Sequence, residues 1–65
     1  MVDGFYKDVC KELAAAGYTH VGNAKGSHEK WRHAAIGKIV IVPRNLKSRH
    51  TANGILKDAG LTKRY

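Results

Sequence analysis

Residues 28–43 read HEKWRHAAIGKIVIVP, and this stretch decides the fold. In its first part, His28–His33, charged neighbours flank Trp31, and this alternation predicts a strand with one covered face. After a short connection, the run Ile39–Val42 is β-branched throughout and predicts the strongest strand of the chain. Pro43 ends that strand because proline has no N–H group to donate to a sheet.

Upstream of this stretch, residues 4–16 carry apolar side chains at steps of three and four, which predicts an amphipathic helix. We expect Asp3 to cap the N-terminus of this helix and Gly17 to end it. The aromatic and β-branched residues of Tyr18–Val21 then predict a first strand, and Gly22–Gly26 is interpreted as a turn. The apolar stripe of the helix consists of Phe5, Val9, Cys10, Leu13 and Ala16.

Downstream of Pro43, residues 44–47 form a basic loop, and Ser48 is placed to cap a second helix. The apolar residues of this helix recur at helical spacing, and Gly60 ends it so that Leu61 can fold back on it. They are Ala52, Ile55, Leu56 and Ala59. The element order is therefore helix, three strands, helix. It predicts one α+β domain over residues 1–65, an α-β-β-β-α arrangement in which two helices pack on one face of a three-stranded antiparallel sheet.

The charge of the chain narrows the classes of partner. Twelve Lys and Arg against five Asp and Glu give a net charge of +7 on 65 residues, which favours a polyanionic partner. The N-terminal segment is interrupted by charges and no apolar run is long enough for a membrane span, so we expect neither a signal peptide nor a membrane contact, and a cytoplasmic protein. The single Cys10 on the apolar stripe excludes an internal disulfide, and the four histidines lack the paired spacing of a metal site, so no metal or cofactor is expected.

The alternation around Trp31 also predicts which side chains face solvent. As the largest apolar side chain, Trp31 is expected to point toward the helices, with Glu29 and His33 on its side of the sheet. His28, Lys30 and Arg32 then project from the open face. Such a row can bind phosphate oxygens and present a group able to transfer protons at neutral pH.

Four segments occur in this order along the chain: Ala16-Gly17-Tyr18, Lys25-Gly26-Ser27-His28-Glu29-Lys30-Trp31, Ile39-Val40-Ile41-Val42-Pro43 and Ile55-Leu56-Lys57-Asp58-Ala59-Gly60-Leu61. Together they resemble one family, the HicA toxins. HicA toxins are small mRNA interferases of type II toxin–antitoxin systems, and the resemblance covers about residues 5–62. It implies a fold like that of double-stranded-RNA-binding domains, ribosome-independent cleavage of mRNA, and neutralisation by an acidic HicB-type antitoxin that masks the active face.

Carried over to this chain, the resemblance places the catalytic histidine at His28, with Gly26 and Ser27 completing the motif. Two positions depart from the family. Many relatives have a histidine shortly after the proline of the third strand, where this chain has Arg44-Asn45. Many also have an arginine before the Gly-Ser-His motif, where this chain has Gly22-Asn23, and Lys25 or Arg44 is expected to replace that phosphate contact. The expected RNA-binding residues are Lys25, Gly26, Ser27, Lys30, Arg32, Arg44 and Lys47.

The residues themselves support metal-independent cleavage, in which the ribose 2′-OH attacks the adjacent phosphorus. His28 can act as base or acid, and Lys30 and Arg32 can offset the charge that develops on the phosphate. One imidazole cannot fill both roles at once, so a water, a lysine or an incompletely catalysed leaving step completes the reaction. Two other functions use the same surface: a non-catalytic RNA-binding module, and a basic domain that binds an acidic protein.

Overall fold

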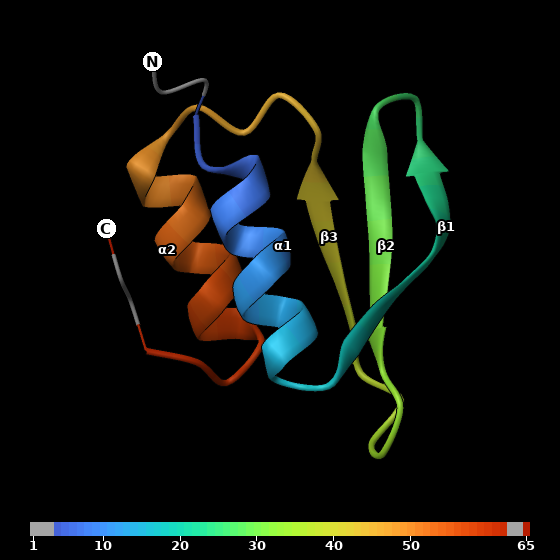
Figure 1. Ribbon diagram of the computed structural model, residues 1–65. Coiled ribbons are helices and arrows are strands. Elements are labelled where there is room, and N and C mark those ends of the chain that lie inside the picture. The colour runs from blue at the N-terminus through green and yellow to red at the C-terminus, as the bar shows by residue number, and fades with distance from the viewer. Residues whose placement is uncertain (1–3, 63–64) are drawn as a thin grey trace.

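The computed structural model describes residues 4–62 and 65, and its element order is the predicted one, helix, three strands and helix (Figure 1). The sheet has the strand order β1-β2-β3 and both of its pairings are antiparallel. Both helices lie on the same face of the sheet, which confirms the predicted α+β architecture (Figure 1). The elements are α1 (Tyr6–Ala15), β1 (Tyr18–Lys25), β2 (His28–His33), β3 (Ile39–Pro43) and α2 (Arg49–Asp58).

The core lies between the helices and the covered face of the sheet. Both predicted helical stripes contribute to it, and Val40 and Val42 contribute from β3 because alternate residues of a strand point to the same face. Leu46 belongs to this core as well, although the loop that holds it was predicted only as basic. Its carbonyl accepts a hydrogen bond from the Phe5 N–H at 2.7 Å, which ties the loop before α2 to the start of α1. The buried apolar residues are Val9, Leu13, Tyr18, Val40, Val42, Leu46, Ala52, Ile55 and Leu56.

The ends of α2 follow the predicted capping pattern. The Ser48 hydroxyl accepts a hydrogen bond from the Thr51 N–H at 3.3 Å, which satisfies one of the free donors of the first turn. At the other end Gly60 adopts a φ of +82°, and the Leu61 N–H donates to the Leu56 carbonyl at 2.8 Å. This is the Schellman arrangement, in which a glycine with positive φ lets the chain turn back on the helix.

The ends of α1 agree with the prediction only in part. Gly17 ends the helix with a φ of +101°, as expected of a residue just beyond a helix C-terminus. At the start of the helix, Phe5 occupies the cap position and no side chain caps the first turn. The predicted cap, Asp3, lies outside the described residues.

The predicted turn at Gly22–Gly26 is wrong, because β1 continues to Lys25 and pairs with β2 over this length. Two register shifts, between His20 and Gly22 and between Asn23 and Lys25, interrupt the pairing without ending it. The turn itself has only two residues, Gly26 and Ser27. Cross-strand pairing to β2 therefore overrides the turn preference of the glycine and asparagine.

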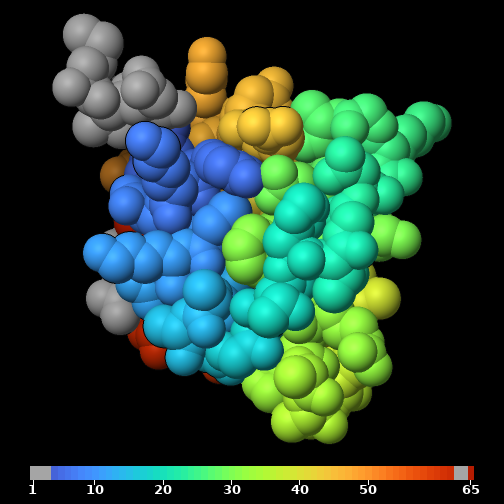
Figure 2. Space-filling model, turned by 45° about the vertical axis from the view of Figure 1, so that its right-hand side comes forward, coloured from blue at the N-terminus to red at the C-terminus, as the bar shows by residue number. Residues whose placement is uncertain are grey.

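Two connections project at opposite ends of the sheet. The turn between β1 and β2 lies at the end that also holds the loop between β3 and α2 (Figure 1). The loop between β2 and β3 lies at the other end, and Figure 2 shows the two projections at the upper right and the lower right of the molecule. Within the described residues, no helix is both long and apolar enough to cross a bilayer.

Candidate functional site

His28 is the first residue of β2 and follows the two-residue turn directly. Gly26 holds a φ of +56° at the first turn position, where glycine is favoured in the tight turns that join twisted strands. The His28 side chain is exposed, and its Nδ1 lies 3.2 Å from the carbonyl oxygen of Lys25. Because a carbonyl oxygen only accepts, this contact requires a proton on Nδ1. In the neutral ring Nε2 is then left as the acceptor.

Lys30 and Arg32 follow His28 at alternate positions of β2, so the three side chains project from the same face of the sheet. Exposure agrees with the predicted alternation at His28, Glu29 and Arg32, which are exposed, buried and exposed in turn. Lys30 and Trp31 lie on opposite faces, yet both are half-buried. The row is about 13 Å long at the usual rise of a strand. Within the described part of the chain, no carboxylate lies within ion-pair distance of Lys30 or Arg32. Both cations are therefore available to an outside anion.

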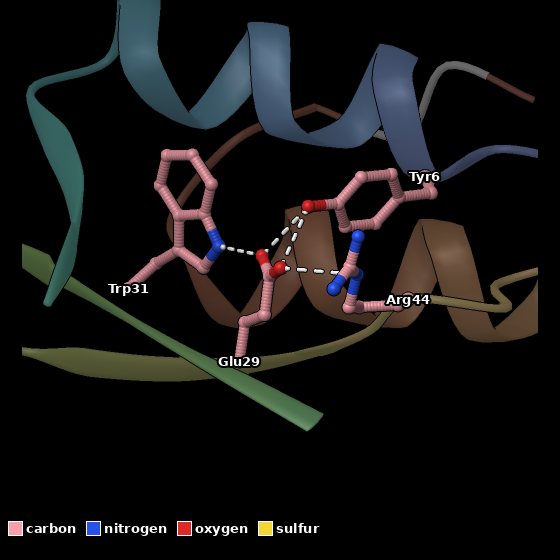
Figure 3. A network of polar contacts seen from close by, with 4 residues as sticks. All are labelled: Tyr6, Glu29, Trp31 and Arg44. Carbon is pink, nitrogen blue, oxygen red and sulfur yellow. Dashed lines mark hydrogen bonds and ion pairs between the residues drawn. The ribbon is translucent and has the colours of Figure 1, made fainter. Parts of the chain in front are cut away.

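On the covered face, Glu29 is only 4% exposed and has three donors (Figure 3). The Tyr6 hydroxyl from α1 lies 2.8 Å from both of its carboxylate oxygens. The Trp31 indole N–H donates to Oε1 at 3.1 Å, and the Arg44 Nε lies 3.5 Å from Oε2. A buried carboxylate is costly unless it is bonded in this way. These contacts therefore allow a charge to occupy the covered side of β2.

The same contacts set the protonation of the cluster. Burial would raise the pKa of Glu29, but hydrogen bonds from Tyr6 and Trp31, with the charges of His20 and Arg44, bring its pKa below the usual value. Burial and the bond to Glu29 raise the pKa of Tyr6 well above its usual range. Glu29 therefore stays ionised, and Tyr6 stays a donor, at neutral pH.

Arg44 lies at the end of the sheet rather than in the row. Its backbone N–H donates to the Ser27 carbonyl at 3.0 Å, which joins the loop after β3 to the turn before His28. Its guanidinium turns to Glu29 on the covered side, while its side chain remains 64% exposed. His28 and Arg44 thus flank the same end of the sheet from opposite faces.

The remaining predicted RNA-binding residues lie near this end. Lys25 pairs with His28 across the hairpin, which places both on the open face. Gly26 and Ser27 form the exposed turn, and Ser27 uses its backbone carbonyl for the contact with the loop after β3. Lys47 is exposed in that loop. Of the residues predicted to bind RNA, Lys30 and Arg32 are the two that extend the basic surface along β2.

The other histidines lie away from the row. His33 is half-buried on the covered side, where its ring meets the Tyr18 ring edge-on at 5.0 Å and its Nδ1 accepts from the Ala35 N–H at 3.1 Å. His20 is exposed, and its ring centroid lies 5.7 Å from that of Trp31. His50 is exposed in the first turn of α2. In the described part of the chain, no three His, Cys, Asp or Glu side chains are placed to hold a metal.

Cys10 has the packing role predicted for it. It is half-buried against the core, and burial raises the pKa of its thiol. A thiol of this kind is a poor nucleophile because the thiolate is the reactive form.

Sequence reasoning missed two features of this region. The first is the bond from Tyr6 to Glu29, which spans 23 positions and has no local signal. The second is an apolar row on the open face, formed by Ile39 and Ile41, which are 48% and 40% exposed. A signal for this row was present, because a run of four apolar residues in one strand places apolar side chains on both faces.

Comparison with known proteins identifies the family. A family model described as the HicA toxin of bacterial toxin–antitoxin systems matches residues 6–61. No curated protein matches the chain significantly, and no solved structure does. The match spans all five elements and includes both the His28 row and the Glu29 cluster. The chain therefore belongs to the HicA family, the toxin component of bacterial toxin–antitoxin systems.

Proposed function

We propose that this HicA family member is a ribosome-independent endoribonuclease, an mRNA interferase that acts in the cytoplasm and uses His28 for proton transfer. One observation carries the proposal. The exposed His28 ring is oriented through Nδ1 by the Lys25 carbonyl and begins a row that continues with Lys30 and Arg32. An oriented imidazole beside cations that have no carboxylate partner among the described residues can supply the proton transfer and the charge stabilisation that metal-independent cleavage of RNA needs.

In the proposed reaction, Nε2 of His28 accepts the proton of the ribose 2′-OH. The 2′-oxygen then forms a bond to the adjacent phosphorus, and the bond from phosphorus to the 5′-oxygen breaks. Lys30 offsets the negative charge that develops on the phosphate oxygens. The leaving oxygen takes its proton from water or a lysine, or departs unprotonated and is protonated afterwards. The products are a 2′,3′-cyclic phosphate and a 5′-hydroxyl, and side chains supply all the charge that the scheme needs without a metal.

The single imidazole limits the rate of this scheme. Among the described residues, His20 and His33 lie on the covered side of the sheet and His50 lies in α2, so none of them stands in the row with His28. Without a second positioned acid or base, one of the two proton transfers lacks a contribution of about 10²- to 10⁴-fold. We therefore expect slower single-turnover cleavage than that of nucleases with two catalytic histidines.

The test compares His28→Ala with His50→Ala, a matched change of an exposed histidine in α2. Each purified protein is incubated with labelled RNA in the presence of EDTA, and cleavage and RNA affinity are measured separately. We expect His28→Ala to abolish cleavage while its affinity stays within about twofold of wild type, since the cations of Lys30 and Arg32 remain available to the phosphates. His50→Ala should cleave like wild type. Equal cleavage by wild type and His28→Ala contradicts the proposal.

The lone imidazole also favours a second candidate function, that of an RNA-binding module without cleavage. This function uses the same basic surface, so charge cannot distinguish the two. It predicts that wild type and His28→Ala leave RNA equally intact and bind it equally well. A third function, a basic domain that only binds an acidic protein, predicts weak RNA binding with little dependence on salt, because few phosphate contacts release counterions.

We also propose that an acidic HicB-type antitoxin masks the face that carries His28. The cations of the row and the exposed isoleucines beside it offer charge and apolar area to such a partner. A neighbouring reading frame that encodes a larger, acidic protein supports this proposal. The direct test is competition, in which the purified neighbour should displace RNA and stop its cleavage. A neighbour that binds without displacing RNA contradicts masking.

A further inference from the structure

The open face of the sheet carries two parallel rows of different chemistry. On β2 the row is His28, Lys30 and Arg32. On β3 the alternate residues that face the same side are Ile39, Ile41 and Pro43, while the valines between them lie in the core. In the observed register Arg32 pairs with Ile39, Lys30 with Ile41 and His28 with Pro43. Each cation or imidazole thus has an apolar neighbour about 5 Å away on the edge strand.

The apolar row is unusual for an edge strand. Edge strands commonly carry charges that discourage contact with other chains, whereas Ile39 and Ile41 remain 48% and 40% exposed here. Both residues lie next to cations that have no carboxylate partner among the described residues. This combination favours a ligand that presents anionic and apolar groups side by side, at the spacing of two neighbouring strands.

A single strand of RNA has this pattern. Its phosphates run along one side, and its bases, when they are not paired, offer flat apolar faces on the other. Successive outward residues of a strand are about 7 Å apart, a distance comparable to the spacing of phosphates in an extended strand. A duplex does not fit, because its bases are stacked inside and its outer surface is phosphate and ribose.

We infer that this surface binds single-stranded RNA, with phosphates on the β2 row and bases against the Ile39–Ile41 row. The inference rests on the proposed function, since it concerns the substrate of the same face. The pairing of His28 with Pro43 places the base next to the scissile phosphate over Pro43 and Ile41. The protein then selects its substrate through the contact of bases with Ile39 and Ile41. Only unpaired bases can make this contact, so the RNA must be single-stranded at the position of cleavage.

The test measures RNA affinity in the His28→Ala protein, so that its outcome does not depend on cleavage. Three labelled probes of equal charge per strand are used: an unstructured RNA 12-mer, the same strand with abasic sites at its three central positions, and its duplex. Fluorescence anisotropy gives the Kd of each probe. We expect the intact strand to bind about fivefold to tenfold more tightly than the abasic strand, from the loss of base contacts. Per strand, the duplex should bind no better than the abasic probe.

The matched variants are the double change Ile39→Thr with Ile41→Thr, and the control Ile36→Thr. Threonine keeps the β-branched shape that suits a strand, and Ile36 is 69% exposed in the loop after β2. The double variant should lose the preference for the intact strand and keep its affinity for the abasic strand. The control should keep both, and thermal unfolding checks that each variant is folded.

Three outcomes overturn the inference. If the protein binds the intact and the abasic strands with equal affinity, the bases do not contact this surface. Tighter binding of the duplex assigns the face to paired RNA. A double variant that binds RNA normally but loses its acidic protein partner assigns the apolar row to that partner. The proposed function fails separately if the wild-type protein prefers the intact strand but does not cleave it.

Discussion

The Tyr6 hydroxyl lies 2.8 Å from both carboxylate oxygens of Glu29, and this contact joins α1 to the strand that begins with His28. Glu29 is covalently adjacent to His28 but points to the opposite face. Its bonds to Tyr6 and Trp31 therefore fix the start of β2 on the covered face of the sheet. On the open face, the Lys25 carbonyl orients the imidazole of His28. The position of the candidate catalytic group thus depends on a charge buried on the other side of the sheet.

The first prediction concerns the strength of this contact. Tyr6→Phe removes one donor from a buried carboxylate, and hydrogen bonds to charged groups are the stronger class, so we expect the free energy of unfolding to fall by about 2 kcal/mol. Tyr18→Phe is the matched control, because its hydroxyl donates to the neutral carbonyl of Ala59 at 3.2 Å. It should cost about 1 kcal/mol. Urea unfolding measures both, and an equal or larger loss for Tyr18→Phe contradicts the assignment.

The second prediction concerns acid stability. The pKa of Glu29 is lowered in the folded protein, so the folded state binds fewer protons here than the unfolded chain does. The stabilisation is then complete above the unfolded pKa of about 4.3 and is lost as the pH falls through the lower, folded pKa. The Glu29→Gln protein lacks this component, so its free energy of unfolding should fall less than that of wild type between pH 6 and pH 3.

Asp8→Asn is the control for this prediction, since Asp8 is exposed on α1 and the change in charge is the same. Asp8→Asn leaves the Glu29 cluster intact, so this variant should keep the loss of stability in acid that comes from Glu29. At pH 7 the Glu29→Gln protein should also be less stable than wild type, by about 1–3 kcal/mol, because the donors around position 29 lose a charged acceptor. If the free energy of unfolding of Glu29→Gln falls as much as that of wild type between pH 6 and pH 3, then other carboxylates control unfolding in acid.

The third prediction concerns the basic row. Each phosphate contact to single-stranded RNA contributes about 0.7 to the slope of log affinity against log salt. Lys30→Gln combined with Arg32→Gln should therefore reduce this slope by about 1.4. Lys11→Gln is the control, because Lys11 is exposed on α1 and so lies on the helical side of the molecule. A slope that changes equally in Lys11→Gln points to diffuse attraction by net charge rather than contact with the row.

The architecture was predictable because each element carries its own local signal. The apolar stripes of the two helices, the capping residue Ser48 and the terminal Gly17 and Gly60 all act within a few residues of where they stand. The alternation around Trp31 likewise assigned His28 and Glu29 to opposite faces. The sequence was sufficient to predict an element wherever the residues that stabilise it lie close together in the chain.

The features that were predicted wrongly depend on contacts between residues far apart in the sequence. Gly22, Asn23 and Ala24 have low strand propensity, and only pairing with β2 keeps them in β1. Trp31 was expected to be the buried side chain, yet it is half-buried while Glu29 is almost fully covered, since Glu29 finds partners on α1 and in the loop after β3. The helices cover only the face of β3 that carries Val40 and Val42, so Ile39 and Ile41 on the other face stay exposed.

The last prediction compares two glycines with open space around them. A Cβ atom at Gly26 or at Gly54 would meet no atom within 4 Å, so backbone conformation alone decides the effect of alanine. Gly26 has a φ of +56°, where an L side chain costs about 1–2 kcal/mol, so Gly26→Ala should destabilise by this amount. Gly54 lies inside α2, where alanine is favoured over glycine by about 1 kcal/mol, so Gly54→Ala should stabilise.

Urea unfolding of the two variants gives the signs directly, and Gly26→Asn adds a third measurement. Asparagine tolerates positive φ better than alanine does, so this variant should recover part of the stability lost in Gly26→Ala. Because the turn also sets the approach of the Lys25 carbonyl to the His28 Nδ1, cleavage should fall in Gly26→Ala and recover in parallel in Gly26→Asn. Stability changes of the same sign at both glycines, or cleavage that is unchanged in Gly26→Ala, would contradict the inference that the positive φ of Gly26 positions the histidine.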